Sequence, residues 1–248
     1  MNWFRYSSAQ ALYPVAGRII PWCTAAACVL MAAGLYIGLL VAPTDFQQGD
    51  AYRIIFVHVP AAWMSMFLYV VMAIWAGIGL GLNARTSFMM AQSIAPTGAM
   101  FTFLALLTGS LWGKPTWGTW WVWDARLTSE LILLFLYVGV MLLHTSIDDS
   151  RRADRASAIF ALVGVVNVPI IYFSVRWWNT LHQGASVSAT SAPKMAGTML
   201  SAMLLMTLGF WMYSFVVVLI RMRGVILERE RISSIIRSAA EEPSMEGA

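Results

Sequence analysis

Six long apolar stretches dominate this sequence and leave few folds open to it. A bilayer core of roughly 30 Å is crossed by about 20 apolar residues of α-helix, and a backbone in lipid must satisfy its own hydrogen bonds. The chain is 59% apolar and only 11% charged, and nearly all charges fall between the stretches. We therefore predict an all-α polytopic membrane protein with six transmembrane helices. Their expected limits are residues 19–41, 59–82, 88–110, 127–143, 158–175 and 195–220.

Positive charge is divided unevenly between the two faces of this predicted bundle. Of the sixteen lysines and arginines, five fall in the loops 42–58, 111–126 and 176–194, and the rest lie in the termini and the other two loops. Because cytoplasmic segments carry the excess of Lys and Arg, both termini are expected in the cytoplasm. The three arginine-poor loops then form the outer face of the membrane. This excess accounts for the net charge of +4 without nucleic acid, since no soluble segment could form a basic domain.

No linker or repeat divides the chain into several domains. One membrane domain is expected at residues 1–225, followed by a charged cytoplasmic tail at 226–248 whose first part continues the last helix. The first apolar stretch is too long for a signal peptide and lacks a small-residue cleavage site, so we interpret it as a retained helix. Cys23 and Cys28 do not form a CxxC pair, and both are expected to be reduced and buried.

Two pairs of helix-breaking residues stand inside the apolar stretches. Pro96 with Gly98, and Asn167 with Pro169, are expected to kink the third and fifth helices. A polar amide at this depth needs a hydrogen-bond partner, so the Asn167 side chain is expected to bond a neighbouring helix rather than a ligand.

The middle outer loop is exceptionally rich in tryptophan. Residues 112–124, the Trp-rich segment, hold five of the twelve tryptophans of the chain. Tryptophan also favours the headgroup level of a membrane, so an aromatic belt is an alternative interpretation. Gly113, Pro115 and Gly118 favour a compact turn that a flat apolar ligand could approach closely. The tryptophans of the segment are Trp112, Trp117, Trp120, Trp121 and Trp123.

Two of the three histidines are expected at the same outer face. His58 stands just before Pro60 at the start of the second helix, and His182 lies in the third outer loop beside Trp177 and Trp178. Each alone could be a polar interface residue. Together, beside so many tryptophans, they could ligate a haem iron from its two axial sides. His144 falls at the opposite face, where its expected role is a favourable contact with the C-terminal helix dipole.

Charged residues flank the Trp-rich segment. Asp124 is placed to cap the fourth helix, and Arg126 and Glu130 stand four apart on its first turns. One interpretation is a cap with a surface ion pair. The other is that Arg126, with Lys114 or Arg53, binds the haem propionates, because guanidinium groups pair well with carboxylates.

At these residues the sequence resembles the cytochrome c maturation protein C family of haem-handling membrane proteins. The matching stretches are residues 52–63, 117–130, which contain the Trp-Trp-Val-Trp-Asp motif, and 177–184. The resemblance extends over about residues 20–225. It implies six transmembrane helices, a transiently held haem b at the outer face, axial ligation by His58 and His182, and presentation of the haem by the Trp-rich segment.

The resemblance also implies partners and a direction of traffic. The haem would pass to a membrane-anchored haem chaperone, and the chain would work beside a two-subunit ABC transporter and a small single-helix protein. No catalytic residue is expected, because the chain would only position the haem. Two alternatives stay open: a b-type cytochrome that exchanges electrons with quinone, and a small-solute transporter. The first is expected to carry histidines deep in its helices, and the second ionisable residues inside its spans, where only Glu130 stands here.

Overall fold

The computed structural model describes residues 9–178, 180–182 and 195–241, and over these residues the chain is helical without a named strand. The prediction of an all-α protein is confirmed. The α-helices are α1 (Ala9–Tyr36), α2 (Ile55–Leu82), α3 (Arg85–Trp117), α4 (Ala125–Ser146), α5 (Ser150–Gly164), α6 (Asn167–Trp177) and α7 (Gly197–Glu241). A π-helical turn η2 (Ile37–Val41) and a 3₁₀ turn η3 (Asp50–Ile54) connect α1 to α2.

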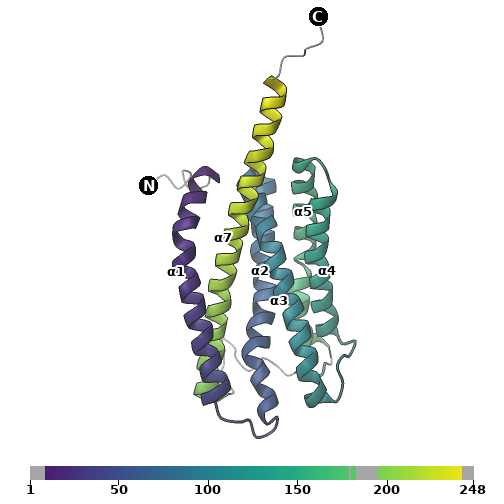
Figure 1. Cartoon of the computed structure of the whole chain (residues 1–248). Coiled ribbons are helices and arrows are strands. Elements are labelled where there is room, and N and C mark those ends of the chain that lie inside the picture. The colour runs from purple at the N-terminus through teal and green to yellow at the C-terminus, as the bar shows by residue number, and fades with distance from the viewer. Residues whose placement is uncertain (1–8, 179, 183–194, 242–248) are drawn as a thin grey trace, which may run out of the picture.

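Six of the helical segments in the described part are long and apolar enough to cross a membrane, and α5 and α6 together make one of them. This agrees with the number of transmembrane helices expected from the sequence. In Figure 1 the helices run side by side, with α2 and α3 in the middle, α1 against α7 on one side, and α4 and α5 on the other. The beginning of α1 and the end of α7 lie at the same end of the bundle, where α7 extends well beyond its neighbours (Figure 1).

Close packing in the middle of the bundle centres on Tyr137 of α4. Its ring meets that of Tyr69 edge to face at 4.8 Å, and its hydroxyl donates to the backbone oxygen of Ser65 at 2.8 Å. A Cβ atom on Gly98 would overlap the Tyr137 ring, so glycine at this position lets α3 and α4 approach each other. The hydrophobic effect does not drive helices together in lipid. Close packing around small residues and hydrogen bonds of polar groups, as at this contact, stabilise the bundle instead.

The fifth membrane segment is broken where the sequence predicted a kink. α5 ends at Gly164, and α6 begins at Asn167, two residues before Pro169. The Asn167 side chain donates to the Ser129 backbone oxygen of α4 at 2.9 Å, so the expected bond to a neighbouring helix is confirmed. α3, in contrast, runs through Pro96 as one helix, and a kink there stays a prediction.

Two further expectations, on the last helix and on the two cysteines, have different outcomes. α7 continues past residue 220 to Glu241, as predicted, whereas residues 242–248 lie outside the described residues. The prediction of buried cysteines is wrong: Cys23 is half-buried, and Cys28 is exposed on the surface of the bundle. α1 packs mainly against α7, so much of its surface has no protein neighbour.

Candidate functional site

The Trp-rich segment begins as a helix and ends as a loop. α3 continues to Trp117, seven residues beyond its predicted end, and Gly118 closes it in the left-handed conformation with φ 79°. The Gly118 N–H then donates to the Lys114 backbone oxygen at 3.1 Å. The expected turn at Gly113 and Pro115 is therefore wrong, because both residues lie within α3, and only Gly118 acts as a turn residue.

His58 lies in the first turn of α2 and faces the last turns of α3. Its Nδ1 atom is 3.1 Å from the Ala105 backbone oxygen and 3.0 Å from Thr108 Oγ1. A Cβ on Gly109 would stand 3.0 Å from His58 Cε1, so a glycine here lets the imidazole lie against the α3 backbone. The histidine is therefore fixed by groups that only the folded bundle brings to it.

His182 is held by the residue that caps α4. Its Nδ1 atom lies 3.2 Å from Asp124 Oδ2, and Asp124 Oδ1 accepts from the Leu127 N–H at 2.8 Å. The predicted cap is confirmed, and the second oxygen of the same carboxylate orients the imidazole. Burial lowers the pKa of His182, as does the charge of Arg126, while Asp124 acts in the opposite direction. A lowered pKa favours the neutral imidazole, the form that binds metals.

The hydrogen bonds of both histidines indicate the same tautomer. A carbonyl oxygen can only accept, and the Thr108 hydroxyl already donates to the Leu104 backbone oxygen at 2.6 Å. The proton of His58 therefore belongs on Nδ1, and the contact with a carboxylate assigns the proton of His182 to Nδ1 as well. The Nε2 lone pair of each imidazole is left for another atom, which is the arrangement seen in histidines that ligate metals.

Tryptophans of α3 stand beside each imidazole. Trp112 lies edge to face with His58 at a ring distance of 5.6 Å, and Trp117 lies likewise with His182 at 4.9 Å. The structure thus brings His58, His182 and the Trp-rich segment together, and we call this cluster the two-histidine site.

The remaining tryptophans offer apolar surface around the site. Trp121 is half-buried and meets Trp123 edge to face at 5.4 Å. The other members are at least half exposed, with Trp123 the most exposed at 76%. The exposed set is Trp120, Trp123, Trp177 and Trp178.

Three basic residues were expected to be available for carboxylates, and they differ in how far they are already engaged. Arg53 donates to the Asp50 carboxylate at 3.0 Å and to the backbone oxygens of Gly38 and Ala42, at η2 and its C-cap. Lys114 donates to Gly118 O at 3.2 Å. Among the described residues, Arg126 makes only a long hydrogen bond of 3.5 Å, to Ile171 O. Arg126 therefore has the most donor capacity left.

The alternative of a surface ion pair between Arg126 and Glu130 is wrong. Glu130 is 8% exposed and accepts from the Ser65 hydroxyl of α2 at 2.6 Å, and no ion pair joins it to Arg126 among the described residues. Spacing by four residues suggested that the two side chains would meet, but Glu130 meets Ser65 of α2 whereas Arg126 contacts Ile171 of α6. The helix packing decided the partner.

Several residues of the site carried no signal in the sequence. Thr108 and the Ala105 backbone oxygen meet His58 across a helix interface, and Gln48 Oε1 accepts from Trp112 Nε1 at 2.8 Å. These pairs are separated by about 50 residues or more, so local spacing could not join them.

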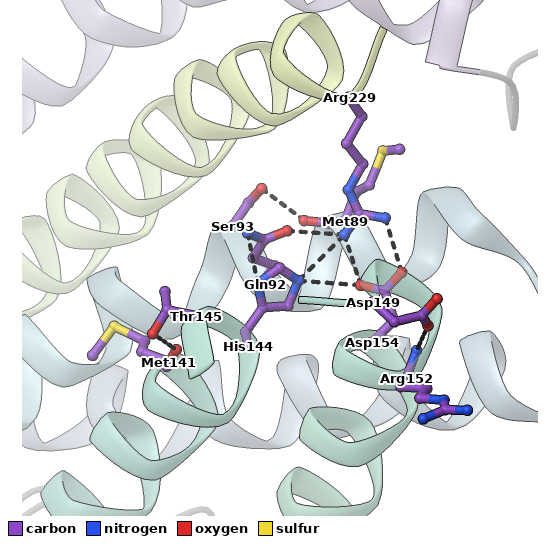
Figure 2. Close-up of polar contacts among 10 residues, drawn as sticks. All are labelled: Met89, Gln92, Ser93, Met141, His144, Thr145, Asp149, Arg152, Asp154 and Arg229. Carbon is purple, nitrogen blue, oxygen red and sulfur yellow. Dashed lines mark hydrogen bonds and ion pairs between the residues drawn. The ribbon is translucent and has the colours of Figure 1, made fainter. Parts of the chain in front are cut away.

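His144 has a larger role than the predicted contact with a helix dipole. It lies within hydrogen-bond distance of Gln92, Asp154 and Arg229, at the other end of the bundle from the two-histidine site. Figure 2 shows Arg229 reaching from α7 to the Asp154 carboxylate in this network. Asp154 is buried but lies before the predicted fifth stretch, 158–175, so the expectation that Glu130 is the one ionisable residue inside the predicted stretches stays unchanged.

Haem iron needs few ligands from the protein, and the two histidines of the site could supply them. Among the residues that the structure describes, no group of three His, Cys, Asp or Glu side chains converges as a bare metal ion would require. Two imidazoles with open Nε2 atoms beside a wide aromatic surface suit a planar macrocycle that already supplies four ligands to its metal.

Comparison with known proteins agrees with this chemistry. The family model described as Heme exporter protein C matches residues 2–237. The chain belongs to this family. Heme exporter protein C of Escherichia coli K12 is 51% identical over 220 residues, which cover 89% of each chain. Heme exporter protein C of Haemophilus influenzae is 42% identical over 236 residues, covering 95% of this chain and 96% of the relative.

A mitochondrial protein is also similar to this chain. A Marchantia polymorpha protein described as a cytochrome c biosynthesis ccmC-like mitochondrial protein is 52% identical over 159 residues, 64% of this chain and 67% of the relative. With six membrane-length helices in the described part, this member of the Heme exporter protein C family is a multi-pass membrane protein.

Proposed function

We propose that this protein holds haem b transiently at the outer face of a bacterial inner membrane and passes it on for the biogenesis of c-type cytochromes. His58 and His182 would ligate the iron through Nε2. The observation that carries this proposal is that each Nδ1 atom is engaged by an acceptor from a different part of the fold. Both imidazoles are thereby oriented with the ligating nitrogen available.

The aromatic and basic residues around the histidines suit the rest of the macrocycle. Exposed tryptophans of the Trp-rich segment, with Trp177 and Trp178, would cover its apolar faces. Arg126 is the best candidate for a propionate, since its guanidinium has unused donors, and Lys114 and Arg53 would contribute less.

The architecture of the site favours release as well as capture. His182 and the end of the Trp-rich segment lie in loops, which rearrange at lower cost than packed helices. We propose that the recipient is a membrane-anchored haem chaperone, and that the protein works with a two-subunit ABC transporter and a small single-helix protein. The chain would ligate, orient and release haem without catalysing a change in its covalent structure, so it would not be an enzyme.

The ligand assignment is tested with histidine variants of the full-length protein purified in detergent. His58→Ala and His182→Ala are each expected to lose bound haem or the low-spin absorption spectrum of a bis-histidine iron. His144→Gln is the matched control, because it changes a histidine at the other end of the bundle and should retain the spectrum. If both site variants keep the haem content and spectrum of the wild type, the axial assignment is refuted.

The remaining parts of the proposal need separate measurements. Replacing Trp120, Trp121 and Trp123 together should weaken haem capture or transfer to the chaperone, and undiminished transfer would return them to the role of an aromatic belt. A cysteine placed at Thr119 should react with an impermeant thiol reagent applied from the periplasmic side. Labelling only from the cytoplasm would overturn the proposed orientation.

A further inference from the structure

A polar pocket opens at the end of the bundle opposite the two-histidine site. It has a volume of about 410 Å³ and lies between the turn that joins α2 to α3, the beginning of α5, and α7. This volume is far larger than a single buried water requires. Its lining includes four arginines and one acidic residue. The charged and polar lining residues are Asn83, Arg85, Ser150, Arg151, Asp154, Arg155 and Arg229.

The acidic residue of this arginine pocket is already neutralised. Arg229 binds both oxygens of Asp154, at 2.8 Å through Nη1 and 2.6 Å through Nη2 (Figure 2). The pair is buried, and Gln92 and His144 add contacts of 3.3 Å to the same guanidinium. The pair therefore forms a fixed floor of the pocket with little net charge.

The other three arginines leave the mouth of the pocket positive. Arg85, Arg151 and Arg155 are exposed, and no hydrogen bond or ion pair engages their side chains among the described residues. Asp149 does not line the pocket, and its carboxylate caps α5 by accepting from the Arg152 N–H at 2.7 Å. Three unpaired guanidinium groups around one pocket are suited to a polyvalent anion.

The backbone adds positive potential at the same place. Arg85 is the first residue of α3, and no side chain caps this helix, because residue Ala84 occupies the cap position. The first N–H groups of a long helix carry partial positive charge and favour an anion, phosphate in particular. α5 also begins at the pocket, with Ser150 and Arg151 in its first turn.

The pocket lies where the membrane-length helices end, at the face that carries the excess of arginine. We propose that it is a binding site for a phosphate group, supplied by the headgroup of an acidic phospholipid or by a soluble phosphate. Basic pockets between transmembrane helices at this level bind acidic headgroups, because the phosphate is held near the helix ends while the acyl chains stay in the bilayer. The site is independent of the proposed handling of haem at the opposite end.

The test measures retention of phosphatidylglycerol, with phosphatidylcholine as the uncharged comparison, by native mass spectrometry of the full-length protein in detergent. The variant Arg85→Gln with Arg155→Gln removes two unpaired charges of the pocket. The matched control, Arg18→Gln with Arg152→Gln, removes two exposed arginines that do not line it. Each arginine near an acidic headgroup contributes about fivefold to its affinity, so the pocket variant should bind phosphatidylglycerol about 25-fold more weakly.

A second arm separates the two sources of phosphate. Inorganic phosphate is titrated against wild type, pocket variant and control, and the unfolding temperature is followed. Selective retention of phosphatidylglycerol that only the pocket variant loses supports the lipid source. Stabilisation by inorganic phosphate that only the pocket variant loses, without selective lipid retention, supports the soluble source. If neither ligand distinguishes the pocket variant from the control, the phosphate site is refuted.

Discussion

Asp124 joins the folding of α4 to the orientation of His182, and substitutions can separate the two roles. One carboxylate oxygen caps the helix at 2.8 Å, and the other holds the imidazole at 3.2 Å. Asp124→Ala removes both contacts, and Asp124→Ser keeps a capping hydroxyl that is too short to reach the histidine. Asp124→Asn keeps the cap but presents an amide N–H₂ to Nδ1, which would force the proton of His182 onto Nε2.

The expected magnitudes differ between stability and binding. Loss of an N-cap costs about 1 kcal/mol, so Asp124→Ala should lower the free energy of unfolding by about that amount while the serine and asparagine variants change little. Loss of the residue that orients a metal ligand typically weakens metal binding by about 10- to 100-fold, or about 1.4–2.7 kcal/mol. All three variants should lose haem affinity, and Asp124→Asn should lose the most because its imidazole has the wrong tautomer.

The assay is a haem titration of each purified variant, followed by its Soret absorption, beside a denaturation curve of the haem-free protein. Circular dichroism of the haem-free variants checks that α4 is retained. The reasoning is refuted if Asp124→Asn binds haem with wild-type affinity, because an Nε2–H imidazole could not ligate iron. It also fails if the three variants lose stability equally, since only alanine removes the cap.

Three further substitutions probe other contacts. Thr108→Val removes one of two acceptors for His58 Nδ1, so haem affinity should fall by about threefold to tenfold, as for the loss of about 1 kcal/mol from one hydrogen bond. Gly109→Ala should weaken haem binding by displacing His58. Its effect on the free energy of unfolding should be smaller than the packing cost alone, because the helix propensity of alanine offsets about 1 kcal/mol. Arg229→Met should lower the free energy of unfolding by about 3–5 kcal/mol, because it leaves Asp154 buried without its main partner.

Matched controls make these outcomes specific. Gly81→Ala, in α2, adds a methyl group where no atom stands within 4 Å, and its haem affinity should equal that of the wild type. Equal binding by the alanine variants at positions 81 and 109 would contradict the packing argument. For the buried ion pair, the double variant Arg229→Met with Asp154→Asn should be more stable than Arg229→Met alone. A double variant less stable than the single one would contradict an unpaired buried charge as the cause.

Much of the architecture follows from the order of the residues. The apolar stretches alone led to six membrane helices, because lipid offers the backbone no hydrogen bonds and the length of each helix is set by the bilayer. Asp124 could be assigned as a cap, and Asn167 as the partner of another helix, because both depend on the local needs of exposed or buried backbone groups. Helix ends were less predictable, as the extension of α3 to Trp117 shows.

The sequence by itself determined which side chains the candidate site could contain: two histidines, a dense run of tryptophans and a few basic residues at one face. The tertiary structure decided how they can act. Helix packing places the acceptors of His58 on α3. It also makes Ser65, and not Arg126, the hydrogen-bond partner of Glu130, and it brings His144 into a buried network with Arg229. Such contacts join residues far apart in the chain. Periodicity can tell which face of a helix is buried, but only the packed bundle fixes which atoms meet there.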